Sequence, residues 1–141
     1  MPTLNESFSV SDEDHAWSVI SDLNKLVPCV PGGKVTSDNG PESVEAEIEV
    51  DMGSMNMKFA GPVKITEKDD AAKTAKFKAE TKEAGGQSNA TGDVTIKVSG
   101  GECTIDADAN VTGKAASMGE GTIVAVLQQL TKGFADNVGA A

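Results

Sequence analysis

The chain has 141 residues, enough for one globular domain whose core needs no disulfide or metal. Its formal net charge of -10 argues against nucleic-acid binding, which needs clustered Lys and Arg, and against electrostatic adhesion to anionic lipid. Aromatic residues make up 4% of the chain and tyrosine is absent. The inward-facing side chains are therefore expected to be small on average.

No apolar run approaches the roughly 20 residues of a membrane-spanning helix, and the N-terminal sequence lacks the parts of a signal peptide. We therefore expect a cytoplasmic protein. Cys29 and Cys103 stand alone, without CxxC or Cys/His spacing. This pattern predicts neither a metal site nor a disulfide in a reducing compartment.

The first third of the chain predicts one strand, two short helices and a loop. Apolar residues at even positions over 4–10 indicate a strand, and Ser11–Asp14 is typical of a helix N-cap. A second short helix is expected to begin at Asp22 and to end before Pro28. The segment Cys29–Gly33 is rich in turn residues and predicts a loop.

From Val35 onward the sequence predicts an antiparallel meander of six strands. Across a two-residue hairpin turn, paired residues have position numbers with a constant sum and point to the same face. Turns centred on Asn39-Gly40, Gly53-Ser54, Gly85-Gly86 and Gly100-Gly101 match apolar with apolar residues. The expected pairs include Val35 with Val44, Val50 with Met57, Ile48 with Phe59, Ala79 with Gly92, Phe77 with Val94, and Ile96 with Ile105. Only the connection near Asp69-Asp70 is ambiguous by about one residue.

The segment Ser117–Val138 predicts one long amphipathic helix. Its apolar residues recur every three or four positions. Some twenty helical residues span roughly 30 Å, the length of a strand of nine or ten residues. We therefore expect an α+β fold, in which a seven-stranded curved antiparallel sheet wraps around the C-terminal helix and two short helices lie between strands 1 and 2.

The last three strands carry small residues at expected inward positions, where a packed interface usually has Val, Leu or Ile. These residues are Ala75, Ala79, Ala90, Gly92, Ala107 and Ala109. Each missing Leu-sized side chain leaves a gap that costs a few kcal/mol in a closed interior. Two arrangements remain open: a cavity between sheet and helix, or a close approach of the two layers.

These features resemble the carbon monoxide dehydrogenase G-subunit family, a branch of the START-like (SRPBCC) helix-grip ligand-binding domains. The resemblance runs from Phe8 to Val138 and is carried by the Trp17 helix, residues 22–32, Phe59-Ala60-Gly61, Gly92, and residues 111–119. It implies one START-like domain over residues 1–141, with an elongated hydrophobic cavity and no catalytic apparatus. It also implies association with a molybdenum-containing carbon monoxide dehydrogenase, in assembly, electron delivery or recruitment to the inner face of the membrane.

We expect the cavity to bind a hydrophobic guest. The expected ligand-binding residues are Trp17, Leu26, Val30, Ile48, Val50, Met52, Met55, Met57, Phe59, Phe77, Val94, Ile96, Ala107, Met118, Ile123, Leu127, Leu130 and Phe134. The methionines suit an adaptable apolar mouth, and equally a plug at the open end of the sheet. Trp17 suits either a cap on the cavity or ordinary core, and the segment Pro28–Gly33 either a gating loop or a rigid connector.

Catalysis is not expected. His15 is the only histidine, and no Ser/His/Asp or Cys/His set can be assembled around it. Glu45, Glu47, Glu49 and Asp51 alternate with apolar residues and should face away from the cavity. These carboxylates form either a solvated face or a docking surface for a basic partner.

The first functional hypothesis is noncatalytic carriage of a respiratory quinone, menaquinone or ubiquinone, between carbon monoxide dehydrogenase and the membrane. The quinone would be the only bound cofactor. The alternative is an adaptor that matures or recruits the dehydrogenase without a ligand. A cyclase-type enzyme is a third hypothesis, weakened because few polar residues beyond Thr81, Cys103 and Lys114 are expected to point inward.

Overall fold

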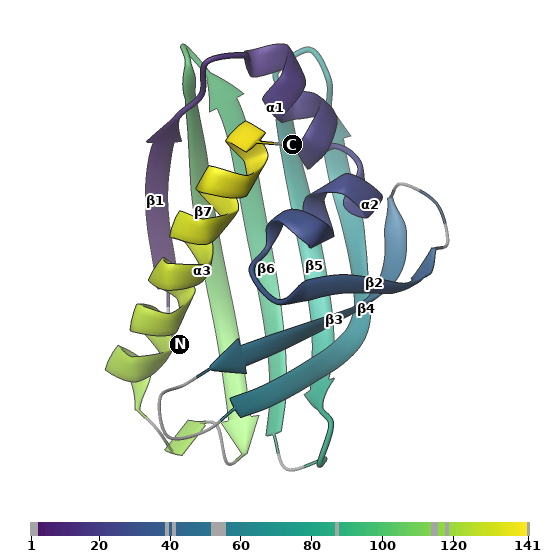
Figure 1. The fold of residues 1–141 in the computed structure, drawn as a ribbon, viewed down its shortest axis with the longest axis vertical. Helices are drawn as coiled ribbons and strands as arrows, with labels where there is room; N and C mark the ends of the chain where they lie inside the picture. Colours follow the sequence, from purple (N-terminus) through teal and green to yellow (C-terminus); the bar gives the residue numbers. More distant parts are fainter. Residues whose placement is uncertain are drawn as a thin grey trace.

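A computed structural model places a long helix against one face of a curved antiparallel sheet (Figure 1). The structure describes residues 3–38, 40, 42–51, 56–86, 88–113, 116–117 and 119–140. In chain order the elements are β1 (Thr3–Ser9), α1 (Glu13–Ile20), α2 (Leu23–Leu26), η1 (Val27–Cys29), β2 (Gly33–Asp38), β3 (Ser43–Asp51), β4 (Asn56–Asp69), β5 (Thr74–Glu83), β6 (Ser88–Ser99), β7 (Glu102–Gly113) and α3 (Glu120–Ala140).

The sheet is a seven-stranded meander with the order β1-β7-β6-β5-β4-β3-β2. Every neighbouring pair is antiparallel, and β1 closes the order by pairing with β7. Figure 1 shows α3 crossing the face of β1, β7 and β6, while β2, β3 and the first half of β4 curl around toward the same side. The expected fold class is therefore confirmed.

The strand registers agree with most of the predicted hairpins. Val50 pairs with Met57 and Ile48 with Phe59, as the constant-sum rule requires. The rule also holds for Phe77 with Val94, Ala79 with Gly92, and Ile96 with Ile105. The ambiguous connection is a turn over residues 70–73, because Asp69 pairs with Thr74.

The predicted register of the first hairpin is wrong. Val35 pairs with Ala46, whereas Val44 pairs with Asp38, and the register shifts between Val35 and Ser37. A two-residue turn at positions 39 and 40 would need residue 41 to donate its N–H across the turn, and proline has none. The connection is therefore longer than two residues.

The pairing of β4 with β5 is interrupted at Gly61 and Pro62, and its register shifts farther along, between Ile65 and Glu67. The pairing passes from Ala60 opposite Lys82 to Val63 opposite Ala79, with neither Gly61 nor Pro62 in the ladder. A Cβ on Gly61 would overlap the carbonyl oxygen of Glu80, so only glycine permits this approach of the two strands. Figure 1 shows β4 curving so that its first half runs across the front of the molecule together with β3.

Helices α1 and α2 begin where the sequence places their caps. The predicted end of the second helix and the predicted start of the long helix differ from the structure. Asp12 Oδ1 accepts from the His15 N–H at 3.0 Å, and Asp22 Oδ1 accepts from the Asn24 N–H at 2.9 Å. Pro28 does not stop the chain from turning, because it lies early in the 3-10 turn η1, where its missing N–H costs nothing. The long helix α3 begins at Glu120, later than Ser117.

Candidate functional site

An apolar cavity of about 210 Å³ lies between α3, the inner face of the sheet and the chain around η1. The expected cavity is therefore present, and the two layers do not close over the small residues. The cavity is lined by Leu4, Leu26, Val30, Val63, Phe77, Ala79, Val94, Ile96, Ile105, Ala107, Leu127, Leu130, Thr131 and Phe134.

Half of the residues expected to bind a guest lie around this cavity. They are Leu26, Val30, Phe77, Val94, Ile96, Ala107, Leu127, Leu130 and Phe134. The sequence pattern did not predict Leu4, Val63, Ile105 and Thr131 as lining residues. Ala79 was expected to face inward but was not among the expected ligand-binding residues. Pairing rules contained the signal for some of the missed residues, because Ile105 lies opposite Ile96 and Val63 lies opposite Ala79.

Several expected ligand-binding residues lie elsewhere. Ile48, Val50, Met57 and Phe59 belong to the second apolar cluster, which consists of Val50, Met57 and Phe59 with Ile48, Ala90, Val111 and Val126 packed against it. Ile123 is buried but does not line the cavity. Trp17 packs in the main core, and its Nε1–H donates to Asp70 Oδ1 at 2.9 Å. Met52, Met55 and Met118 lie outside the described residues, so their role at a mouth remains a prediction.

The cavity wall offers a guest almost no hydrogen bonds. Thr131 carries the only side-chain polar group among the described lining residues, and its Oγ1 already donates to the Leu127 carbonyl oxygen at 2.8 Å. None of the described residues that line the cavity has a titratable side chain. The wall therefore suits hydrocarbon, since an unpaired polar group of the guest would lose its water without compensation.

The loop that follows η1 is held from two sides. A Cβ on Gly133 of α3 would overlap the Pro31 ring, and a Cβ on Gly32 would overlap the Glu49 carbonyl oxygen. Asn137 Nδ2 also donates to the Cys29 carbonyl oxygen at 2.8 Å. These close approaches favour a rigid connector over a gating loop.

The histidine and Cys103 lie away from the cavity. His15 is half-buried on α1 and does not line the cavity. Burial raises the pKa of the Cys103 thiol to about 12, so this side chain behaves as a small apolar group. Across the described residues, no group of three or more His, Cys, Asp or Glu is placed to hold a metal ion.

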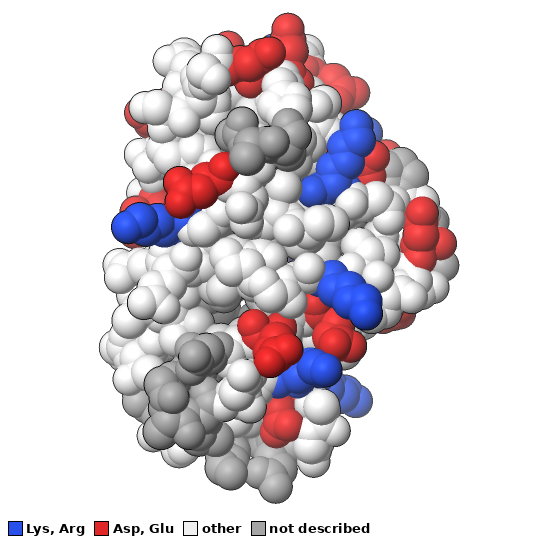
Figure 2. All heavy atoms as spheres, viewed as in Figure 1, with Lys and Arg blue, Asp and Glu red and all other residues white. Residues whose placement is uncertain are grey.

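The carboxylate row on β3 is partly neutralised. Glu47 Oε1 forms an ion pair with Lys58 Nζ at 3.2 Å. The Asn56 side-chain amide donates a hydrogen bond of 3.1 Å from Nδ2 to Glu49 Oε1. Figure 2 shows the α3 side of the molecule with large uncharged areas, and with charged groups at the top, along the right side, at the left edge and in a mixed acidic and basic group below the centre. No described helix is both long enough and apolar enough to cross a bilayer.

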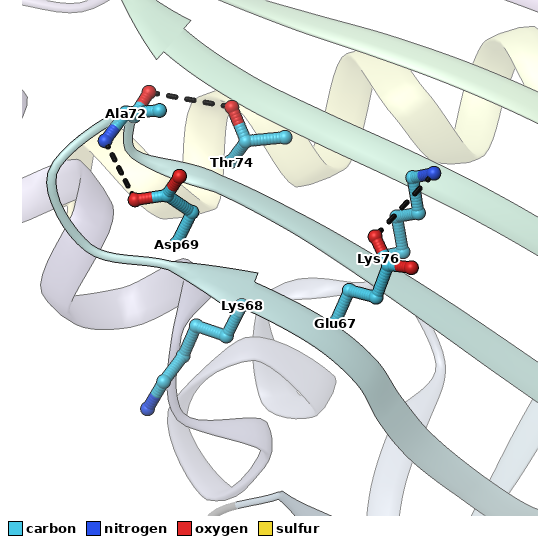
Figure 3. A pocket seen from close by; sticks show the side chains of 6 residues that line it. All are labelled: Glu67, Lys68, Asp69, Ala72, Thr74 and Lys76. Atoms are coloured by element: carbon cyan, nitrogen blue, oxygen red, sulfur yellow. Dashed lines mark hydrogen bonds and ion pairs between the residues drawn. The ribbon is translucent and has the colours of Figure 1, made fainter.

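A second hollow of about 550 Å³ lies at the turn between β4 and β5 (Figure 3). Its polar groups are used locally: Asp69 Oδ1 accepts from the Ala72 N–H at 3.1 Å, and Glu67 pairs with Lys76 at 3.5 Å. Lys68 points away from that pair (Figure 3) and forms an ion pair with Glu42 at 3.3 Å. None of its lining residues is buried. This hollow is therefore a surface feature of the turn, and the apolar cavity is the candidate site.

Solved structures with the same fold are numerous but distant in sequence. A conserved protein from Geobacillus kaustophilus has a TM-score of 0.76 at 18% identity, over 98% of this chain and 91% of that one. An aromatase/cyclase from Streptomyces has a TM-score of 0.60 at 11% identity, over 98% and 91%. A START superfamily protein from Mycobacterium smegmatis has a TM-score of 0.57 at 11% identity, over 98% and 94%.

These similarities show a START-like helix-grip fold, as the sequence resemblance implied. No curated protein sequence matches the chain significantly. The family model for the G-subunit of carbon monoxide dehydrogenase, CoxG, matches residues 7–141, which is nearly the whole chain. The chain therefore belongs to the carbon monoxide dehydrogenase CoxG family.

Proposed function

We propose that this protein binds and carries a hydrophobic molecule and does not itself catalyse a reaction. The observation that carries the proposal is the wall of the cavity, which is apolar apart from Thr131, whose hydroxyl is already bonded to Leu127. Each methylene moved from water into such a site contributes roughly 0.8 kcal/mol to binding. General acid or base catalysis needs a titratable group within reach of the guest. None of the described residues that line the cavity has a titratable side chain.

The family supports a respiratory quinone, menaquinone or ubiquinone, as the guest. Its description names carbon monoxide dehydrogenase, an enzyme whose electrons need an acceptor, and quinones dissolve in membrane rather than in water. The protein would take the quinone to the dehydrogenase and return it to the inner face of the membrane after reduction. The isoprenoid tail fits an apolar wall, and the more polar ring stays at the end of the cavity that lies away from the second apolar cluster.

Size constrains this proposal. The cavity of about 210 Å³ is smaller than the roughly 300–1,000 Å³ of ordinary small-molecule pockets. A quinone with a long tail therefore requires the cavity to widen, or leaves part of its length outside it. A compact guest of several fused rings must fit within the same volume, because it cannot leave part of its length outside the cavity.

Extraction of the purified protein with organic solvent, followed by mass spectrometry, tests the proposal. We expect a prenylated quinone in the extract, and a marked loss of it in Ala107→Leu, which fills the cavity. The control is Ala60→Leu, because Ala60 is exposed on the opposite face of β4. An extract without any lipid or quinone, from protein purified without detergent, counts against carriage.

The adaptor hypothesis predicts the opposite ranking of variants. Charge reversal of Glu45, Glu47 and Glu49 should abolish pull-down of carbon monoxide dehydrogenase if this surface recruits the enzyme, and Ala107→Leu should have no effect. The ion pair of Glu47 with Lys58 reduces the charge available to a partner, and the hydrogen bond from Asn56 occupies one carboxylate oxygen of Glu49. Carriage is therefore the better-supported function.

A further inference from the structure

Beside Ala79 of the cavity wall, the inner face of the sheet has room for a side chain at Gly92. Gly92 lies between Ala79 on β5 and Ala109 on β7 in the strand register. A Cβ on Gly92 would meet one described atom within 4 Å other than those of its chain neighbours, the Asp108 carbonyl oxygen at 3.7 Å. No described atom of α3 comes within 4 Å of that Cβ position, so the long helix does not pack directly on Gly92.

Gly92 separates the two apolar regions of the interior. On β6, Val94 and Ile96 line the cavity, whereas Ala90 packs in the second apolar cluster. These residues and Gly92 occupy alternate positions of one strand and so share a face. The helix shows the same division, because Leu127 lines the cavity and its neighbour Val126 packs against the second apolar cluster.

We propose that Gly92 is a specificity-determining position, at which an open passage joins the cavity to the second apolar cluster and admits a guest with an extended hydrocarbon chain. The inference rests on the proposed function. From Ile96 to Ala90 the cavity and the passage together follow six residues of strand, about 20 Å at 3.3 Å per residue. A chain of that length uses space that a compact ring system cannot reach, which resolves the small volume of the cavity.

The position can be blocked without disturbing the fold. Gly92 is not among the glycines with a positive φ, so a β-branched residue adopts its backbone conformation without strain. Valine at this position would place its methyl groups in the open space. These methyl groups would lie outside the cavity itself, so the part of a guest that the cavity wall contacts would not be obstructed.

Menaquinone-1 and menaquinone-4 provide the test, because they share one ring and differ in tail length. Dissociation constants are measured by calorimetric titration for the natural sequence, Gly92→Val and the outward-facing control Thr91→Val on the same strand. We expect Gly92→Val to weaken menaquinone-4 by about tenfold or more, since at least two methylenes lose their burial. Menaquinone-1 should stay within about twofold, and Thr91→Val should change neither.

The outcomes separate this inference from the proposed function. Binding of neither quinone by the natural sequence removes the proposed function and the passage with it. If Gly92→Val binds each quinone as tightly as the natural sequence does, the passage is overturned and the proposed function is not. An equal loss of both quinones in Gly92→Val also overturns the passage, because the inner part of the site would then depend on residue 92. Should Gly92→Val fail to fold, Gly92→Ala replaces it, with a smaller loss expected for menaquinone-4 only.

Discussion

The indole Nε1–H of Trp17 donates a hydrogen bond of 2.9 Å to Asp70 Oδ1 and so ties helix α1 to the turn between β4 and β5. The ring of Trp17 is buried in the main core, with 8% of the residue exposed. The residue that the sequence offered as a possible cap on the cavity therefore serves the packing of α1 on the sheet.

Replacement of this indole should affect stability and leave binding unchanged. Trp17→Phe removes the donor and part of the buried ring, so we expect the free energy of unfolding to fall by about 1–3 kcal/mol. Denaturant unfolding measures this loss. Asp70→Asn keeps an acceptor oxygen and should cost less than Asp70→Ala. A change in quinone affinity in Trp17→Phe would show that the ring takes part in the site.

Two glycine-to-alanine substitutions on neighbouring parts of the sheet should have opposite effects. Gly61→Ala places a Cβ against the Glu80 carbonyl oxygen and should destabilise by about 1–3 kcal/mol, because backbone must move. Gly92→Ala meets only ordinary contact and should be neutral or slightly stabilising, since it restricts the unfolded chain. Thermal unfolding compares the two, and equal melting temperatures would contradict this account of the close approach at Gly61.

A matching pair exists on α3. Gly133→Ala pushes on the Pro31 ring, so the contact that holds the loop after η1 must open. Gly121→Ala meets no described atom within 4 Å and should gain up to about 1 kcal/mol from helix propensity. Unfolding in denaturant should rank Gly121→Ala as the more stable variant, and hydrogen exchange should show faster exchange around Pro31 in Gly133→Ala. Equal exchange there would contradict the clamped loop.

The buried thiol of Cys103 predicts a pH dependence of stability. Burial raises the pKa of Cys103 from 9.0 to about 12 in the folded protein. A folded pKa above the unfolded value favours folding below pH 9, and this contribution is lost as the pH rises from 9 toward 12. The stability advantage of the natural sequence over Cys103→Ala should therefore narrow across that range in denaturant unfolding. A constant difference would mean that burial does not raise the pKa of this thiol above its value in the unfolded chain.

Much of the sheet could be predicted from sequence because hairpin pairing is a local rule. Apolar residues that must share a face constrain the register, and a slip of one residue would turn them all outward. The rule failed at the first hairpin, where Pro41 lacks an N–H and the register shifts after Val35. The long helix was equally visible, since its apolar period does not depend on any partner.

The sequence by itself determined the strand alternation, the caps at Asp12 and Asp22, and the shortage of bulk on the inner face of β5, β6 and β7. Only the tertiary structure decided which apolar residues enclose the cavity. Phe59 and Val50 carry the same inward pattern as Phe77 and Val94, yet they pack in the second apolar cluster. The reason is the curvature of β4, which turns β3 and the start of β4 across the front (Figure 1). Leu4 lines the cavity for a comparable reason, because β1 closes against β7, a pairing between distant segments that no local period reveals.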